Sequence, residues 1–181
     1  MTNLSLEQGT EEWKEMRRKY IGASDAAAIM GISPFCTPYK LWEVKHGLAE
    51  IQENEAMRRG TRLEEQARQA YETEVGFGVI PKVVFHPEIP YLMASLDGIS
   101  VDGSIAVEIK NCNIYDHSLA KEGRVPLHYI PQLQHQLACL GHDLIHYFSY
   151  NNSEGILVEV RRDQAYIDRL LEAEAKFWEK H

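Results

Sequence analysis

Glu108 and Lys110 place an acid and an amine two residues apart in an otherwise apolar stretch. Residues 104–110 are rich in β-branched and apolar side chains and follow Asp102-Gly103, a pair typical of tight hairpin turns, so they are predicted to form a strand. Because side chains alternate across a strand, Glu108 and Lys110 share one face. Burying two such groups costs free energy, which favours a functional role for them.

The other arm of this hairpin supplies a second acid, Asp97. With a two-residue turn, counting outward places Gly98 opposite Val107 and Asp97 opposite Glu108, with Cβ atoms roughly 5 Å apart. Two carboxylates that close repel each other unless a proton or a cation lies between them. A hard divalent cation with oxygen ligands is the expected occupant, and Lys110 stands beside it. The alternative is a solvated hairpin end with a surface ion pair.

The bulk composition describes an ordinary globular protein. With 181 residues, 44% hydrophobic and 25% charged, the chain fits one domain spanning residues 1–181. No apolar run approaches the roughly 20 residues of a membrane span, and the polar first residues do not resemble a signal peptide, so a cytoplasmic protein is expected. A net charge of −8 opposes long-range attraction to nucleic acid, so any nucleic-acid surface must be local.

The cysteines do not predict a metal cluster or a disulfide framework. Cys36, Cys112 and Cys139 are scattered, with no C-x-x-C pair. His135 and Cys139 have the i, i+4 spacing of two metal ligands on a helix, but this pair is interpreted as two neighbours on one helix face.

The hydrophobic pattern predicts an α/β fold with a mixed five-stranded sheet flanked by helices. Pro81 suggests either an edge strand or a strand that begins later, and Pro131 fits the first turn of a helix. The expected helices span about 10–19, 39–46 after a loop that ends at Pro38, 54–74, 115–121, 129–140 and 163–179. Residues 20–31 are interpreted as a short helix with its flanks, capped by Ser24 or Asp25. The expected strands span about 79–85, 91–99, 104–110, 144–150 and 156–161.

Several short motifs follow one another in a fixed order. They are Trp13-x-x-x-Arg17, Ile21-Gly22-Ala23-Ser24-Asp25, Gly60-x-x-x-Glu64, Ser95-Leu96-Asp97-Gly98, Glu108-Ile109-Lys110 and Tyr129-x-x-Gln132-x-Gln134. As an ordered set they resemble the YqaJ-like viral recombinase and phage lambda exonuclease family, a branch of the PD-(D/E)xK nucleases, over about residues 9–141. The resemblance implies a restriction-endonuclease-like core and a metal-dependent DNA exonuclease.

The resemblance also assigns roles around the hairpin. Asp97 and Glu108 match the metal ligands, with the Ile109 carbonyl as a further ligand, and Glu64 matches an additional acid that reaches the metals directly or through water. The implied cofactor is Mg²⁺, with Mn²⁺ as a substitute. Lys110 matches a lysine that positions water and offsets charge in the transition state; a lowered pKa beside two metals would also let it accept a proton, and both roles remain open.

Gln132 matches a glutamine that orients water or phosphate near the metals. Gln132 and Gln136 are spaced i, i+4 and can face one site, whereas Gln134 lies on another side of the helix. The resemblance favours Gln132.

Arg17 and Ser24 match residues that bind a terminal 5′-phosphate. Arginine offers a planar fork, and a serine at a helix N-terminus adds a hydroxyl and backbone N–H groups. The alternatives are a solvated arginine and an ordinary helix cap. Asp25 is assigned a structural role.

Arg58, Arg59 and Arg62 precede Glu64 on the long helix and either follow phosphates or pair with Glu55 and Glu65 along the helix surface. The aromatic residues Phe35, Tyr39 and Trp42 either stack on bases of a fraying end or pack in the core, and burial is expected most strongly for Trp42.

The resemblance thus implies a Mg²⁺-dependent exonuclease that digests one strand of duplex DNA from a 5′ end and leaves 3′ single-stranded tails. By resemblance it acts in the cytoplasm of a bacterial host cell, works with a single-strand annealing recombinase and forms a trimeric ring around DNA, with no membrane partner. Two alternatives stay open: a structure-selective endonuclease on the same core, and a catalytically silent module that binds DNA ends.

Overall fold

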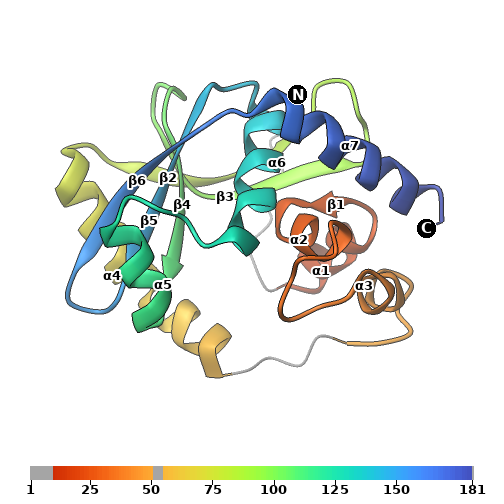
Figure 1. Ribbon diagram of the computed structural model, residues 1–181, viewed down its shortest axis with the longest axis horizontal. Helices are drawn as coiled ribbons and strands as arrows, with labels where there is room; N and C mark the ends of the chain where they lie inside the picture. The colour runs from red at the N-terminus through yellow and green to blue at the C-terminus, as the bar shows by residue number, and fades with distance from the viewer. Residues whose placement is uncertain (1–9, 51–54, 181) are drawn as a thin grey trace.

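The computed structural model describes residues 10–50 and 55–180. A mixed sheet of six strands forms its centre, with helices on both faces (Figure 1). The strands are β1 (Ile21–Gly22), β2 (Val79–Phe85), β3 (Leu92–Ser100), β4 (Ala106–Asn111), β5 (Leu144–Tyr150) and β6 (Gly155–Arg161). The helices are α1 (Glu11–Arg18), α2 (Ala26–Ile29), α3 (Pro38–Lys45), α4 (Glu55–Val75), α5 (Ile114–Lys121), α6 (Ile130–Leu140) and α7 (Gln164–Trp178), with the short 3₁₀ helices η1 (Ala23–Asp25) and η2 (Leu127–Tyr129).

The α/β class and the mixed sheet are confirmed, but the sheet has one strand more than expected. The extra strand, β1, lies in residues 20–31, which the sequence pattern predicts to be a short helix with its flanks. It contains only two residues, both buried, and pairs in parallel with Leu92 and Met93. Two residues are too few to show the alternation that identifies a strand, so the sequence pattern could not reveal it.

The helix ends follow local capping chemistry. Thr10, Asn113 and Asp163 each accept a backbone hydrogen bond from the first turn of the following helix, and Pro131 lies in the first turn of α6. The expected first residue of the long helix, Asn54, lies outside the described residues. Across residues 10–50 and 55–180, none of the helices is both long and apolar enough to span a bilayer.

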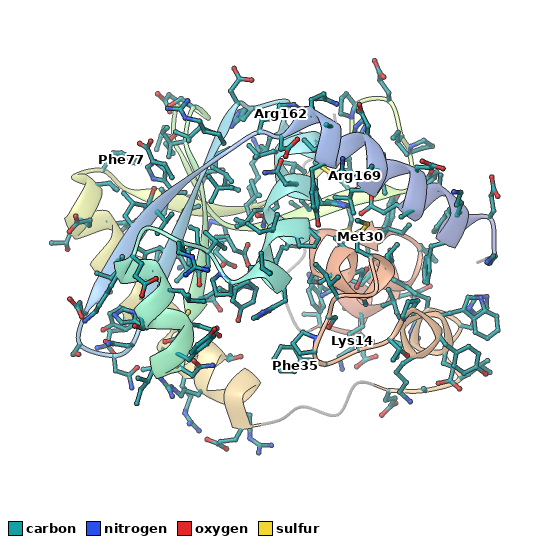
Figure 2. The ribbon with its side chains drawn as sticks, in the orientation of Figure 1. Lys14, Met30, Phe35, Phe77, Arg162 and Arg169 are labelled. Carbon is teal, nitrogen blue, oxygen red and sulfur yellow. The ribbon has the colours of Figure 1, made fainter. Side chains whose placement is uncertain are left out.

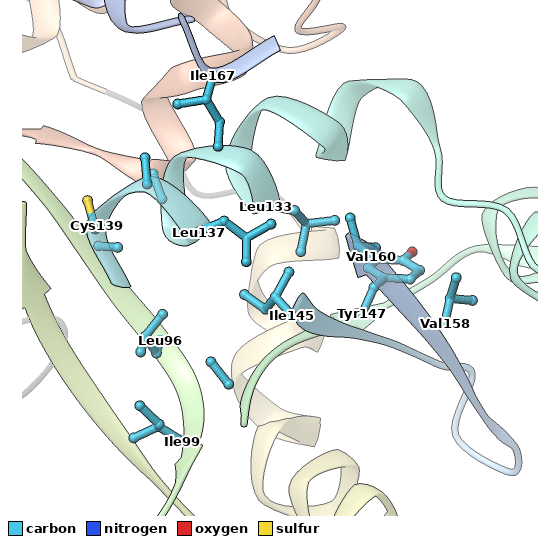
Figure 3. Packing of buried hydrophobic residues seen from close by; sticks show 14 of the residues in the cluster. Leu96, Ile99, Leu133, Leu137, Cys139, Ile145, Tyr147, Val158, Val160 and Ile167 are labelled. Atoms are coloured by element: carbon cyan, nitrogen blue, oxygen red, sulfur yellow. The ribbon is translucent and has the colours of Figure 1, made fainter. Parts of the chain in front are cut away.

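Each face of the sheet packs on its own hydrophobic cluster. On one face, Leu133 and Leu137 of α6 and Ile167 of α7 cover Ile145 and Tyr147 (Figure 3). On the other, α4 packs against a smaller cluster made of Ala67, Tyr71, Val79, Val107, Ile109, Phe148 and Tyr150. Val107 and Ile109 therefore face α4, which leaves the alternate residues of β4 to face α6.

The sheet divides along one side of β3. Strand β2 pairs with β3 from Met93 to Ser100, so β1 and β4 must both pair on the opposite side. There β1 pairs at residues 92–93 and β4 at residues 98–99. Among the described residues, no strand pairs with residues 94–97 on that side, so β1 and β4 diverge from this point. Asp97 lies at the fork.

A bulge on the β2 side affects the same position. The register moves by one residue between Ile80 and Lys82, so that Asp97 and Gly98 together lie opposite Pro81. Proline has no N–H to donate to the ladder, and a bulge re-aims the side chains next to it. The edge position expected for β2 is confirmed, and the additional effect of Pro81 is to break the alternation of β3 at Asp97.

The hairpin register is confirmed at two positions, since Gly98 pairs with Val107 and Ile99 with Ala106. The expected pairing of Asp97 with Glu108 is not part of the ladder, because the strands diverge at Asp97, and the turn is longer than expected. The expected two-residue turn is replaced by a longer loop, and β4 begins at Ala106 rather than at residue 104. Local hydrogen bonds explain the difference, since Asp102 Oδ1 accepts from the Ser100 and Ser104 hydroxyls and from the Ser104 amide.

Replacing Gly98 with alanine should destabilise the fold, because its Cβ would lie 2.5 Å from Val79 Cγ2 and 3.0 Å from Val107 Cγ1. Urea unfolding of Gly98→Ala should show a loss of about 1–3 kcal/mol. Gly60→Ala is the control: it lies inside α4 with nothing within 4 Å of a new Cβ, and should add about 0.5–1 kcal/mol. Equal effects of the two changes would contradict the close packing at Gly98.

Candidate active site

Asp97, Glu108 and Lys110 converge at the fork of the sheet. Lys110 Nζ lies 2.6 Å from Glu108 Oε1, and the Ile109 amide donates a 2.8 Å hydrogen bond to Asp97 Oδ2. The charges of both acids raise the pKa of Lys110, so all three groups lie within interaction range of one another. The convergence expected from the hairpin is therefore found.

Two amides of α6 hold the Glu108 carboxylate. Gln132 Nε2 donates to Oε1 over 2.6 Å, and Gln136 Nε2 donates to Oε2. Both oxygens of a nearly fully buried acid are thus bound, and Oε1 also faces Lys110. The shared face of Gln132 and Gln136 is confirmed, and Gln136 is as close to Glu108 as the glutamine that the motif favoured.

Gln134 has a different place. Its Nε2 donates to the Arg161 carbonyl and its Oε1 accepts from the Asp163 amide, both over 2.9 Å. It therefore connects α6 to the start of α7 and lies away from the carboxylates, as the helical spacing predicts.

Lys110 is held in its charged form. Burial acts to lower its pKa, but the charges of Glu108 and Asp97 outweigh burial and the pKa lies above its usual value. The ring of Tyr129 lies 5.2 Å from Lys110 Nζ, where its π-face favours a cation. Burial raises the pKa of Tyr129 to about 12, so that phenol is neutral at ordinary pH.

The pKa of Asp97 is also raised, and for a carboxyl group this shift favours the neutral form. Burial, then the charge of Glu108, raise its pKa to about 8, against the opposing effects of Lys110 and the Ile109 amide. One ammonium therefore does not compensate the buried Glu108 and the half-buried Asp97, and additional positive charge at this point would be stabilising.

The donor set fits a hard divalent cation. Asp97 and Glu108 offer carboxylate oxygens, and the Gln136 Oε1 atom is buried with no hydrogen-bond partner among the described residues. Over that same part of the chain, no three His, Cys, Asp or Glu side chains gather into a metal-binding group. Two carboxylates suit Mg²⁺, which keeps several waters and takes further oxygens from a substrate phosphate.

Glu64 is near this cluster but does not form one ligand group with it. The Glu64 carboxylate pairs with Arg68 over 2.8 Å, one turn further along α4. Its charge nevertheless contributes to the raised pKa of Asp97, so it acts on the site through space. Its role as an additional acid stays a prediction.

A second polar cluster, which we call the Arg17 pocket, consists of Arg17, Ser24, Asp25 and Lys45. Arg17 Nη2 lies 2.5 Å from Ser24 Oγ and 3.1 Å from Asp25 Oδ1. The structure thus brings together the two residues expected to bind phosphate. The structural role expected for Asp25 also holds, since its Oδ2 accepts from the Gly22 amide.

The expected helix N-terminus at Ser24 is not a strong source of positive potential. Ser24 lies within the three-residue 3₁₀ helix η1, followed only by the four residues of α2. A macrodipole needs several aligned peptide units, so the pocket depends on the Arg17 guanidinium and the Ser24 hydroxyl instead.

The arginines of α4 pair along the helix. Arg58 and Arg62 both contact Glu55, over 3.3 and 2.9 Å, so the pairing alternative is present for both. The expected partner of Arg62, Glu65, pairs with Arg68 instead. These exposed pairs are weak, so phosphate contact by Arg58 and Arg62 stays a prediction.

The three aromatic residues do not form part of the core. Phe35, labelled in Figure 2, and Tyr39 are 79% and 69% exposed, and the Phe35 ring meets the edge of His128 at 6.0 Å. Trp42 was expected to be buried but is only partly so, because its Nε1 donates to the Lys180 carbonyl at the rim of a groove between α2, α3 and α7. That groove, of about 590 Å³, includes none of the carboxylates or of the Arg17 pocket.

His135 and Cys139 do not form a metal site. His135 Nδ1 lies 2.6 Å from Glu174 and Nε2 lies 2.9 Å from the Met93 carbonyl, so both ring nitrogens are occupied within the core. Burial acts against the charged ring, yet Glu174 and then Cys139 hold the pKa of His135 well above its usual value.

One known protein family matches most of this chain. The YqaJ-like viral recombinase domain matches residues 12–143, a range that contains both the Arg17 pocket and the carboxylates Asp97 and Glu108. The chain belongs to this family. The uncharacterized protein YqaJ of Bacillus subtilis (strain 168) is 32% identical over 179 residues, 95% of this chain, and the chain spans 56% of that relative's length.

Solved structures support the family fold. The alkaline exonuclease LHK-Exo of Laribacter hongkongensis is 30% identical, with a TM-score of 0.81 over 94% of this chain and 92% of that one. LHK-Exo in complex with dAMP matches with a TM-score of 0.79 and 31% identity over the same shares. A phage-related exonuclease of Haemophilus somnus 129PT shares the fold at 15% identity, with a TM-score of 0.63 over 89% of this chain and 94% of that one.

In this family member, Asp97→Asn should stabilise the metal-free protein at alkaline pH. A pKa raised from 3.8 to about 8 makes the charged carboxylate unfavourable in the fold. The contribution of Asp97 to the free energy of unfolding is therefore fully present below pH 3.8 and is lost as pH rises through 8. Asparagine keeps an acceptor for the Ile109 amide without that charge. In EDTA, unfolding at pH 9 should show a gain of about 2 kcal/mol over the wild type, with a much smaller gain at pH 5.

Asp102→Asn is the matched control on the same hairpin. Hydrogen bonds from Ser100 and Ser104 lower the pKa of Asp102 to about 2. The contribution of Asp102 to the free energy of unfolding is therefore present above pH 3.8 and is lost as pH falls through 2. This variant should gain nothing at pH 9. A gain for Asp102→Asn, or none for Asp97→Asn, would refute the proposed charge imbalance.

Proposed function

We propose that this chain is a Mg²⁺-dependent exonuclease that digests one strand of double-stranded DNA from a 5′ end and leaves 3′ single-stranded tails. The observation that carries the proposal is the cluster of the buried Glu108 with the half-buried Asp97 and Lys110, which one ammonium leaves short of positive charge. Further support comes from the likeness to LHK-Exo, an alkaline exonuclease, along nearly the whole of both chains.

In the proposed mechanism, Asp97 and Glu108 would hold the cation, with the Ile109 carbonyl as a further ligand. Mg²⁺ at this position would supply an activated water and offset charge on the scissile phosphate. The water oxygen bonds to phosphorus and its proton passes to solvent, while the P–O3′ bond breaks and the leaving 3′ oxygen takes a proton from solvent. The remaining strand then begins with a new 5′-phosphate.

The chain's own residues have distinct tasks in this step. Gln132 and Gln136 fix the Glu108 carboxylate, so that its orientation does not depend on the ligand. Lys110 offers its N–H groups to a phosphate oxygen; its raised pKa supports this charge-stabilising role over that of a proton acceptor. Tyr129 keeps the ammonium in place through its ring.

The Arg17 pocket would receive the terminal 5′-phosphate. Its guanidinium and the Ser24 hydroxyl offer charge-assisted hydrogen bonds that a 5′-hydroxyl end cannot accept equally. Each cleavage regenerates the group that this pocket recognises. Because the net charge is −8, retention on DNA is proposed to come from a closed ring of three copies, and a single-strand annealing recombinase is the proposed partner for the 3′ tails.

Duplex DNA labelled at either end provides the main test. In Mg²⁺ the label should be released first from the 5′ end, Mn²⁺ should substitute, and EDTA should stop release. Asp97→Ala should lower the rate by about 10³-fold, since it removes a carboxylate from the cation. Covalently closed circular DNA is the control for the endonuclease alternative: cleavage of the circle at the rate of the linear duplex would contradict an end-dependent enzyme.

Glu64 and Glu65 allow a matched comparison of the additional acid. Both carboxylates pair with Arg68, over 2.8 and 3.0 Å, but only Glu64 acts on the pKa of Asp97. Glu64→Gln should lower the Mg²⁺-dependent rate by about 10- to 100-fold, as for other groups just outside a metal's ligands, and Glu65→Gln should stay close to the wild type. Equal rates for the two variants would remove Glu64 from the site.

A further inference from the structure

Lys45 is a buried ammonium for which the motifs give no role. It lies at the end of α3, and its side chain is 5% exposed. Its Nζ donates to Asp25 Oδ2 over 2.6 Å, to the Arg17 carbonyl over 2.6 Å and to the Tyr20 carbonyl over 2.7 Å. All three of its hydrogens are occupied within the protein, so Lys45 has none left to contact DNA.

The position of Lys45 decides the charge of the Arg17 pocket. Asp25 is a single negative charge between two cations, with Lys45 on Oδ2 and Arg17 on Oδ1. Arg17 is the more exposed cation, 28% against 5%, and it also contacts Ser24. Without Lys45, Asp25 would neutralise Arg17 and leave no net charge for a phosphate.

The energetics of the cluster agree with this arrangement. Burial acts to raise the pKa of Asp25, but the charges of Lys45 and Arg17 outweigh it and hold that pKa below its usual value. Burial lowers the pKa of Lys45, and the Asp25 charge opposes that shift. A buried carboxylate that loses one of its charged partners is strongly unfavourable. Without Lys45, Asp25 would therefore bind Arg17, its other partner, more closely.

We propose that Lys45 is a positioning residue that sets the specificity of the Arg17 pocket: by neutralising Asp25, it leaves the pocket with a net positive charge, carried by the Arg17 guanidinium, to bind a terminal 5′-phosphate. The inference rests on the proposed function for the identity of the ligand. It goes further in naming a residue, remote from the ligand, that determines the preference for a phosphorylated end.

The test uses two duplexes that differ only in a 5′-phosphate or a 5′-hydroxyl. For each protein, kcat/KM is measured on both in Mg²⁺, and binding of both is measured in EDTA, where no cleavage occurs. The wild type should prefer the phosphate. Lys45→Met should reduce that preference by about 10-fold, the size of one charge-assisted hydrogen bond.

A double variant separates charge from architecture. Lys45→Met combined with Asp25→Asn again leaves Arg17 as the one net charge of the pocket, so it should recover most of the preference. A Lys45 that only ties α3 to α1 predicts no recovery, because the double variant loses the same ammonium contacts. Lys40→Met is the control on the same helix; Lys40 is exposed and pairs with Glu43, so the preference should not change.

Each outcome decides the proposal. An unchanged preference in Lys45→Met, or no recovery in the double variant, overturns it. Lys45→Gln, which keeps a donor toward Asp25, replaces the single variant if Lys45→Met does not fold. A wild type that hydrolyses DNA without preferring the phosphate refutes the inference and leaves the proposed function intact. A wild type that binds the phosphorylated end in EDTA but never hydrolyses DNA refutes the proposed function alone.

Discussion

The arrangement of this fold depends on placing two carboxylates, the buried Glu108 and the half-buried Asp97, beside a single ammonium where the sheet divides. Such a group is unfavourable away from water unless its oxygens have partners. The surrounding elements supply partners to both Glu108 oxygens through two amides of α6, and to Asp97 Oδ2 through the Ile109 amide of β4. The remaining shortage of positive charge is what makes the site suited to a cation and a phosphate.

Much of the fold follows from the sequence because its signals are local. The Gly98–Val107 register required only a turn and a period of two, and the ends of most helices follow from caps such as Thr10 and Asp163. The misses have physical causes. Strand β1 is too short to show a pattern, and the Asp102 side chain competes with the ladder and lengthens the turn.

From spacing, the sequence predicts the parts of the candidate site that lie on one strand, one helix or one hairpin; the family motifs add Arg17 and Ser24, and neither source identifies Lys45. The shared face of Glu108 and Lys110, and that of Gln132 and Gln136, follow from spacing alone. Lys45 could not be found in this way, because its partners lie 20 to 28 residues away and its burial depends on how α3 packs.

Helix α6 is shared between the site and the C-terminal part of the fold. Gln132 and Gln136 hold Glu108, while Gln134 and His135 bind α7 through Asp163 and Glu174. We therefore expect the carboxylate to unfold together with the last helix of the chain. Local fluctuations that open a surface loop would leave both in place, so the geometry around Glu108 should persist until α6 and α7 separate.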